Sequence, residues 1–160
     1  MIPGVMVEFL GRASVAAAST RTRDLVPRVH FLTGWYVEEN REVLDCLVSE
    51  GFADGLLESL QDNGQLAVTA EVIGPHETYQ FKGIFEGTRP LNETDQRGHE
   101  ACRRRFFDTV RRHYGNQFAD EAVFWRAGTP AIAIRCRVRE IYVQTPGPAA
   151  GQRLFPRGRR

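Results

Sequence analysis

Lysine is almost absent from this sequence of 160 residues: of the 21 Lys and Arg residues, only Lys82 is a lysine. Acidic residues number 20, so the formal net charge is only +1. Proteins that bind nucleic acid in general show a clear excess of positive charge. The near balance of charges therefore argues against nucleic acid as a partner. The preference for arginine over lysine is typical of a biased base composition of the genome, and by itself it indicates no function.

Cysteine is scarce as well, and Cys46, Cys102 and Cys136 are far apart in the chain. An odd number of cysteines without C-x-x-C spacing argues against a disulfide framework and against a zinc site. No apolar run approaches the roughly 20 residues that a membrane span needs. The N-terminus, MIPGVMVEFLGR, lacks the basic region of a signal peptide. We therefore expect no metal, no membrane partner and a cytoplasmic location.

Sequence motifs of the common enzyme classes are missing too. The chain has no nucleophile elbow, phosphate loop, dinucleotide fingerprint or H-E-x-x-H motif. Its acidic residues show no convergent pair of the kind that glycosidases use. The motifs therefore identify no catalytic residue. The arginine run at 103–105 is interpreted as a solvated helix face, with Asp108 placed four residues before Arg112 for an ion pair.

Residues that alternate between apolar and polar predict strands over much of the chain. The predicted strands are 14–20, 28–33 continuing through 35–37, 43–49, 66–72, 78–87 and 131–143. In the second of them, Val29 and Phe31 share one face, and Arg28 and His30 share the other.

Two helices interrupt the strands. Residues 52–61 repeat apolar residues every four positions, and Asn63-Gly64 is a stop signal. Residues 92–114 form the longest predicted helix, with Asn92 as its N-cap and Tyr114 at the end of its buried stripe. A shorter helical pattern covers 118–126. The order of elements favours a small antiparallel barrel over a parallel α/β sheet. We expect a single domain over 1–146, followed by a tail at 147–160 that is rich in Pro, Gly and Arg and forms a loop.

The order of motifs resembles the pyridoxamine 5′-phosphate oxidase-like family of FMN-binding split barrels. The resemblance covers 9–151 and rests on four segments taken together: DLVPRVHFLTG, LVSEGFADGLLESLQDNGQLAVTAEV, TYQFKGIFEG and IYVQTPGPAAG. It implies a mainly β, six-stranded antiparallel split barrel with short helices. It also implies a homodimer with two FMN sites at the subunit interface, and an oxidoreductase activity on a small molecule that the sequence does not name.

The family pattern also implies which residues contact the cofactor. They come from the strand after the proline, from the end of the next strand and from the returning hairpin strand: Arg28, Val29, His30, Phe31, Val48, Ser49, Gln80 and Lys82. A flavin phosphate needs cations, hydroxyls or helix N-terminal amides. The flavin ring needs an apolar wall and hydrogen-bond donors that tune its potential. For Lys82, a solvent-facing strand lysine is the alternative interpretation.

One departure from the family pattern concerns the phosphate. Where the oxidases have a Ser-Arg-Lys grip at the start of the small helix, this sequence has Asp54-Gly55-Leu56. The phosphate would then be bound elsewhere, by Arg21, Arg23, Arg28 or Lys82. The alternative is a flavin-free split-barrel dimer that acts as a binding or interaction module. A third hypothesis is a haem or other tetrapyrrole protein with His30 as a ligand.

Overall fold

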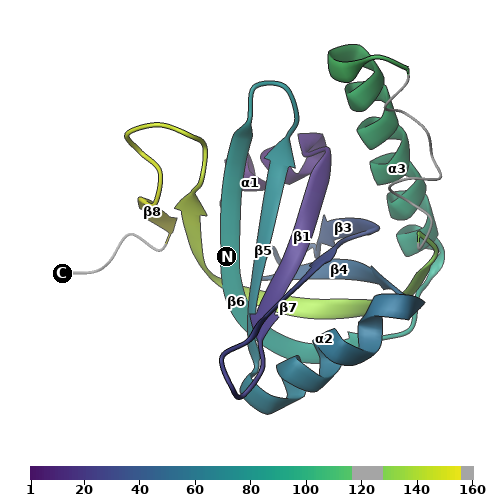
Figure 1. Cartoon of the computed structure of the whole chain (residues 1–160), viewed down its shortest axis with the longest axis vertical. Coiled ribbons are helices and arrows are strands. Elements are labelled where there is room, and N and C mark those ends of the chain that lie inside the picture. Colours follow the sequence, from purple (N-terminus) through teal and green to yellow (C-terminus); the bar gives the residue numbers. More distant parts are fainter. Residues whose placement is uncertain (117–127, 156–160) are drawn as a thin grey trace.

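The computed structural model describes residues 1–116 and 128–155, without the side chains of 50–54. Its elements, in chain order, are α1 (Gly4–Arg12), β1 (Val15–Arg21), β2 (Pro27–Phe31), β3 (Gly34–Val37), β4 (Val43–Ser49), α2 (Glu50–Asn63), β5 (Gln65–Val72), β6 (Glu77–Arg89), α3 (Glu93–Tyr114), β7 (Pro130–Val143) and β8 (Arg153–Phe155). Figure 1 shows a strongly curved sheet with α2 across one end and α3 along one side. The mainly β, antiparallel split-barrel fold is confirmed. The described residues form eight strands rather than six, because β3 and β8 are additional short strands.

The sheet curls because two strands that follow each other in the chain occupy opposite ends of it. Its order is β2-β1-β5-β6-β7-β4-β3, and every pair is antiparallel. The backbone amide of Leu32 donates to Ala16 of β1, whereas the next amide, of Thr33, donates to Leu47 of β4, both at 2.9 Å. The change of partner between these two residues ends β2 and starts β3. The expectation that 35–37 continues the strand of 28–33 past Gly34 is therefore wrong: the two segments are separate strands, and Gly34 belongs to the second.

The core lies inside the curl. Alternate residues of neighbouring strands form a buried transverse row, in which Ala18, Val68, Phe81 and Ile141 are 0% exposed. Helix α1 closes this side with Phe9, whose ring centre lies 4.7 Å from that of Tyr79 in an edge-on contact. Residues one position away in the same strands point to the opposite, outer face of the sheet, because side chains alternate along a strand.

Helix α3 begins and ends at the residues that the sequence indicates. The side chain of Asn92 accepts from the backbone of Asp95, whose carboxylate accepts from the backbone of Asn92 in return, and the helix ends at Gly115. The buried stripe of α3 consists of Cys102, Phe106, Phe107 and Val110. Tyr114 is 49% exposed, and its predicted burial is wrong because the last turns of α3 extend past the sheet (Figure 1).

Two further predictions concern the segments beside α3 and after β7. Asp108 pairs with Arg111 at 3.6 Å, three residues away, in place of the expected Arg112. The predicted helix at 118–126 lies outside the described residues. The tail is not entirely loop, because Phe155 in β8 pairs with Ile141. The domain boundary at 146 stays a prediction. Within the described ranges, no helix has the length and apolar character needed to cross a membrane.

Candidate functional site

Four of the eight candidate residues share the outer face of the sheet. The strand register places Phe31, Ala17, Thr69 and Gln80 in one transverse row. A second row runs from Val29 through Ser19 and Ala67 to Lys82. Neighbouring strands lie about 4.8 Å apart, so the three intervals from β2 to β6 span about 14 Å. The register thus brings Val29, Phe31, Gln80 and Lys82 to the two sides of one strip of sheet.

The middle of this strip carries only small side chains. Ala17, Ser19, Ala67 and Thr69 come from the two central strands, β1 and β5, and are half-buried. On one side, β2 raises Val29 and Phe31, which are 60% and 61% exposed. On the other side, the Gln80 amide nitrogen donates to Oγ1 of Thr69 at 3.3 Å, which fixes its direction. The result is a shallow trough with one apolar wall, one polar wall and a floor of short side chains.

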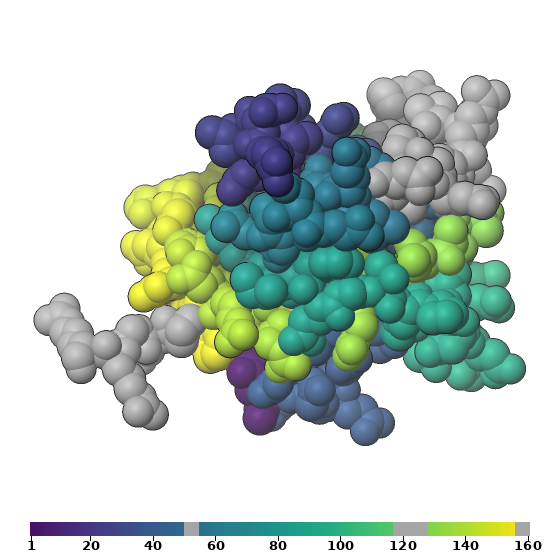
Figure 2. Space-filling model, turned by 90° about the horizontal axis from the view of Figure 1, so that it is seen from below, coloured from purple at the N-terminus to yellow at the C-terminus, as the bar shows by residue number. Residues whose placement is uncertain are grey.

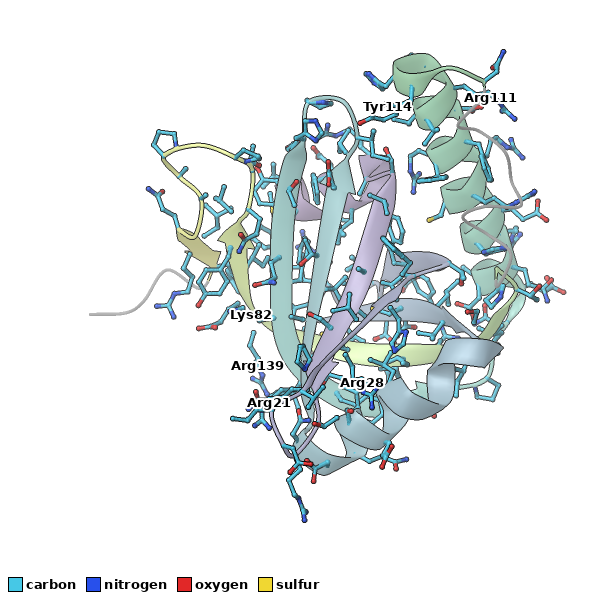
Figure 3. All side chains as sticks on the ribbon, viewed as in Figure 1. Arg21, Arg28, Lys82, Arg111, Tyr114 and Arg139 are labelled. Atoms are coloured by element: carbon cyan, nitrogen blue, oxygen red, sulfur yellow. The ribbon has the colours of Figure 1, made fainter. Side chains whose placement is uncertain are left out.

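The trough deepens at one end into a hollow of about 440 Å³, here called the β6 hollow. It is lined by Ser19, Thr20, Arg21, Gln65, Leu66, Ala67, Lys82, Gly83, Ile84, Arg139 and Glu140. Figure 3 shows Arg21, Lys82 and Arg139 gathered at this end of the sheet. Figure 2 views the same end from below and shows the turn between β1 and β2 projecting beside α2.

The three cations of the β6 hollow are not neutralised by ion pairs. Within the described ranges, neither Arg21 nor Lys82 nor Arg139 makes a salt bridge. Among the described lining residues the one acid is Glu140, which is already engaged. Arg153 donates to it at 2.8 Å and the Tyr142 hydroxyl donates to it at 3.0 Å. The hydrogen bond from Arg153 is the largest cause that lowers the pKa of Glu140, and the charge of Lys82 is a minor one.

A β-bulge brings Arg139 to this hollow. Lys82 pairs with Glu140, but the next residue, Gly83, pairs with Val138, so that Arg139 is an extra residue on β7. Bulges change the direction of a side chain and bend the strand. Arg139 was not among the predicted site residues. Its outward-facing position follows from the alternation of β7, but its place beside Lys82 depends on this bulge.

Arg28 and His30 lie on the other side of β2. They alternate with Val29 and Phe31, and β2 lies next to α2 on this side. Arg28 is exposed, and Figure 3 shows it between the trough and α2. His30 is half-buried, and its pKa is lowered first by burial and then by the charge of Arg28. A neutral imidazole is therefore favoured at position 30.

Val48 and Ser49 are not on the outer face. They end β4, on the other half of the sheet, and are 0% and 3% exposed. The Val48 side chain belongs to the main core, and Ser49 is the N-cap of α2 without a side-chain cap hydrogen bond. The side chain of Asp54, the acid in place of the family grip, lies outside the described residues. Within 50–63 the sequence has four acidic residues and no basic one.

Comparisons by sequence find no relative. No family model matches the chain, and no curated protein sequence matches it significantly. Comparisons by structure do find relatives. HupZ of Group A Streptococcus superposes with a TM-score of 0.56 and 16% identity, over 94% of this chain and 100% of that one. A candidate pyridoxamine 5′-phosphate oxidase of Lactobacillus delbrueckii gives 0.54 and 13%, over 89% and 93%.

A third structure is a pyridoxamine 5′-phosphate oxidase-related, FMN-binding protein of Nostoc punctiforme. It superposes with a TM-score of 0.51 and 10% identity, over 91% of this chain and 86% of that one. At such low identities the likeness concerns the fold, which here extends over nearly the whole of both chains. The chain therefore has the fold of the FMN-binding split-barrel proteins related to pyridoxamine 5′-phosphate oxidase.

Proposed function

We propose that this protein is a flavoprotein that binds FMN in the trough of the outer face and acts as an oxidoreductase on a small molecule. The observation that carries the proposal is the pair of transverse rows, which brings the apolar residues of β2 and the polar residues of β6 to one strip of sheet. Bound FMN would supply hydride and single-electron transfer. The nature of the substrate is left open.

The trough is suited to a flat ring. Short side chains at Ala17, Ser19 and Ala67 leave room above the sheet, where longer ones would fill it. Val29 and Phe31 offer the apolar wall that an isoalloxazine ring needs, and Gln80 offers an amide group for the polar edge of the ring. These residues would bind and orient the ring and exclude water from one side of it.

The β6 hollow is suited to the phosphate. Lys82, Arg21 and Arg139 offer positive charge, and none of the three makes a salt bridge within the described ranges. Charge-assisted hydrogen bonds to a phosphate are about twice as strong as neutral ones. Because residues 50–63 contain no basic residue, this end of the trough would take over the role of the missing Ser-Arg-Lys grip.

The proposal includes a homodimer with the flavin between two subunits. Leu25, Val26, Val29 and Phe31 are all more than half exposed and lie in or next to β2. A group of large apolar side chains on one edge of a sheet is typical of an interface between proteins. A second copy would cover these side chains and close the trough over the ring. The subunit that completes the site would thereby also exclude solvent from it.

A flavin-free dimer that acts as a binding module is the second candidate. The purely acidic segment 50–63 favours it, because an acid at the family's phosphate position repels a phosphate. In that case the apolar residues of β2 would serve the dimer alone. A haem protein with His30 as ligand has less support, because this side chain is half-buried and lies on the α2 side of β2.

The deciding experiment is a visible spectrum of the purified protein, followed by titration with FMN under detection of flavin fluorescence. We expect a yellow protein, or quenching of FMN fluorescence with saturation at one FMN per chain. Light scattering on the same sample should give the mass of a dimer. A folded dimer that never quenches FMN would exclude the first candidate in favour of the second. A spectral change on addition of haem but not of FMN would favour the haem hypothesis.

A further inference from the structure

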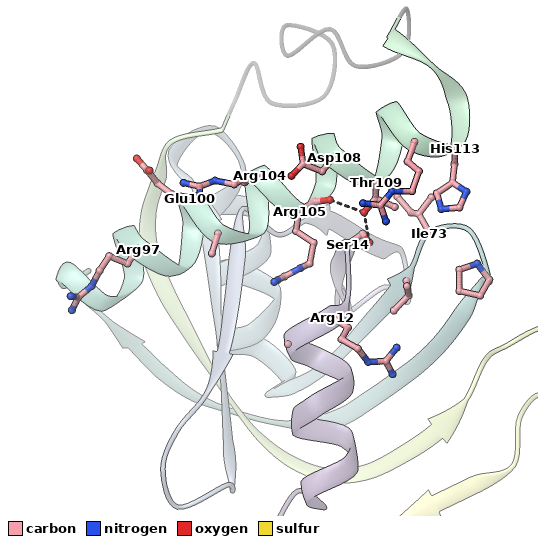
Figure 4. A pocket seen from close by; sticks show the side chains of 15 residues that line it. Arg12, Ser14, Ile73, Arg97, Glu100, Arg104, Arg105, Asp108, Thr109 and His113 are labelled. Atoms are coloured by element: carbon pink, nitrogen blue, oxygen red, sulfur yellow. Dashed lines mark hydrogen bonds between the residues drawn. The ribbon is translucent and has the colours of Figure 1, made fainter.

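A second and larger hollow lies between α3, the end of α1 and the turn that joins β5 to β6. Its volume is about 760 Å³, and it is here called the α3 hollow. It is lined by Gly11, Arg12, Ser14, Val72, Ile73, Pro75, Arg97, Glu100, Ala101, Arg104, Arg105, Asp108, Thr109, Arg112 and His113. Figure 4 shows α3 along one side of it and α1 with the hairpin turn opposite. None of these residues belongs to the trough or to the β6 hollow.

One wall of the α3 hollow is a row of arginines without ion pairs. Arg97, Arg104 and Arg112 follow each other at intervals of seven and eight residues, which places them on one face of the helix. All three are exposed, and none makes a salt bridge within 1–116 and 128–155. At a rise of about 1.5 Å per residue, their Cα atoms lie about 10 and 12 Å apart along the helix.

The acids in the same wall do not neutralise this row. Asp108 has its own partner, Arg111, at 3.6 Å. Glu100 makes no salt bridge in the described part of the chain. The wall thus presents three unpaired guanidinium groups against one unpaired carboxylate, so its potential is positive.

Two other arginines hold the walls in place rather than reach for a ligand. Nε of Arg105 donates to the carbonyl oxygen of Ala13 at 2.6 Å, which ties α3 to the end of α1. Arg12 on α1 pairs with Glu77 of β6 at 3.1 Å. The Ser14 hydroxyl donates to Oγ1 of Thr109 at 3.4 Å, as the dashed line in Figure 4 shows. The hollow is therefore a fixed feature between elements that are bonded to each other.

The opposite wall is apolar. Val72, Ile73 and Pro75 form it at the end of the β5–β6 hairpin. The turn approaches α3 closely, since a methyl group at Gly74 would stand 2.5 Å from the ring of His113. The turn and His113 thus bound one end of the hollow. The hollow thus sets an apolar wall opposite a charged one, and the two suit the organic part and the anionic part of one small molecule.

We propose that the α3 hollow binds a small organic polyphosphate, with its organic group against Val72, Ile73 and Pro75 and its phosphates on Arg104 and Arg112. A guanidinium group can donate two parallel hydrogen bonds to the oxygens of one phosphate. Because arginine side chains are long, Arg104 and Arg112 can reach neighbouring phosphates although they lie about two helical turns apart. The closed end and the nearly neutral chain argue for a small molecule over a nucleic acid. Figure 3 shows Arg111, in the last turns of α3, on the other side of the molecule from Lys82 and Arg139.

The test is calorimetry on the full-length chain with ATP, tripolyphosphate, adenosine and citrate as probes. We expect ATP to bind most tightly, tripolyphosphate more weakly, and adenosine not at all. The double variant Arg104→Gln/Arg112→Gln should weaken ATP binding by about a hundredfold or more, because it removes two charge-assisted contacts. Glu100→Gln should strengthen it, because one repulsive carboxylate is lost. Circular dichroism would verify that the variants fold.

The matched control is Lys82→Met/Arg139→Gln, which also removes two positive charges but from the β6 hollow. It should leave ATP binding unchanged, while Arg104→Gln/Arg112→Gln should leave FMN binding unchanged. Wild-type protein that binds neither ATP nor tripolyphosphate would overturn the proposal. An equal loss in both double variants would also overturn it, because the effect would then reflect net charge. If citrate binds as tightly as ATP, the proposal of a polyphosphate site is wrong, because the hollow then binds anions in general. The outcomes with ATP, tripolyphosphate and citrate are independent of whether FMN binds.

Discussion

Nζ of Lys82, on β6, lies 4.7 Å from the centre of the Tyr142 ring on the neighbouring strand β7. This cation–π contact gives a fixed direction to the chain's single lysine, which also lines the β6 hollow. The hydroxyl of the same tyrosine is bonded to Glu140. Lys82 is thus exposed, which agrees with the solvent-facing interpretation, and the Tyr142 ring also holds its side chain in one direction. Exposure and a role in binding an anion are compatible at this position.

The first prediction concerns this lysine. If FMN binds as proposed, Lys82→Met should weaken its binding by about 10- to 150-fold, because one charge-assisted contact to the phosphate is worth about 1.5–3 kcal/mol. Lys82→Arg keeps the charge and should retain most of the affinity. Fluorescence titration with FMN would measure both. If both variants bind as well as the wild type, the phosphate lies elsewhere.

The second prediction concerns the exposed apolar edge. Phe31→Glu should convert the proposed dimer into a monomer, because two buried carboxylates would face each other across a two-fold interface. Light scattering would report the mass, and FMN titration would report a parallel loss of affinity if the partner completes the site. The control Leu154→Glu changes an exposed apolar residue of β8 and should leave the mass unchanged. A Phe31→Glu variant that stays dimeric would place the interface elsewhere.

The third prediction follows from the close approach of β6 and β7 at the bulge. A methyl group at Gly83 would stand 2.7 Å from Sγ of Cys136 and would also press against the carbonyl group of Arg137. Gly83→Ala should lower the free energy of unfolding by about 2–3 kcal/mol, since a buried backbone has little room to move. Urea denaturation would measure this. Gly55→Ala, where no atom lies within 4 Å of the added methyl group, should be neutral or stabilising.

The fourth prediction concerns a buried ion cluster below α3. Arg89 donates to Asp95 at 2.6 Å and to Asp45 at 2.6 Å, and both carboxylate side chains are 0% exposed. Arg89→Met should lower the free energy of unfolding at neutral pH by about 3 kcal/mol or more. Asp95 would lose its salt bridge, and Asp45 would keep only the longer pair with Arg135, at 3.7 Å. Arg89→Lys should lower the free energy of unfolding less than Arg89→Met does, because a lysine keeps the charge but cannot bond both acids in the same geometry.

The pH dependence of this cluster has a definite sign. The hydrogen bond from Arg89 lowers the pKa of Asp95 below its ordinary value, although burial opposes this. Asp95 therefore stabilises the fold above the ordinary pKa of aspartate, about 3.9, and the contribution is lost as pH falls through the lowered value. Urea denaturation at pH near 7 and near 3 should show this loss in the wild type. In Asp95→Asn the difference between the two pH values should be smaller.

The fifth prediction concerns the thiols. Burial is the largest cause that raises the pKa of Cys46 and Cys102, and it raises the pKa of Cys136 to about 12. The native protein should therefore react slowly with a thiol-specific dye at neutral pH, because the thiolate is the nucleophile. All three cysteines should react at once in denaturant. Rapid reaction of one thiol in the native state would indicate local opening around it.

Local patterns were sufficient to predict most elements of this protein. The stop at Asn63-Gly64 and the start at Asn92 depend on residues that bond to the backbone within a few positions, so they can be read in the chain. The alternation of 28–31 and 78–82 likewise shows which side chains share a face, because side chains on a strand alternate whatever its partners are. The sequence could therefore show that Val29 and Phe31 share one face of their strand, and that Gln80 and Lys82 share one face of theirs.

Only the tertiary structure decided how these faces meet. The switch of hydrogen-bond partners between Leu32 and Thr33 divides one apparent strand into two at opposite ends of the sheet, and depends on strands distant in sequence. The bulge at Lys82 and Gly83 brings Arg139 to the β6 hollow, and a pairing register has no local signal in either strand. The same holds for the α3 hollow, whose walls come from α1, a hairpin and α3. The sequence determines which side chains each element offers, and the packing of distant elements decides which of them converge on a site.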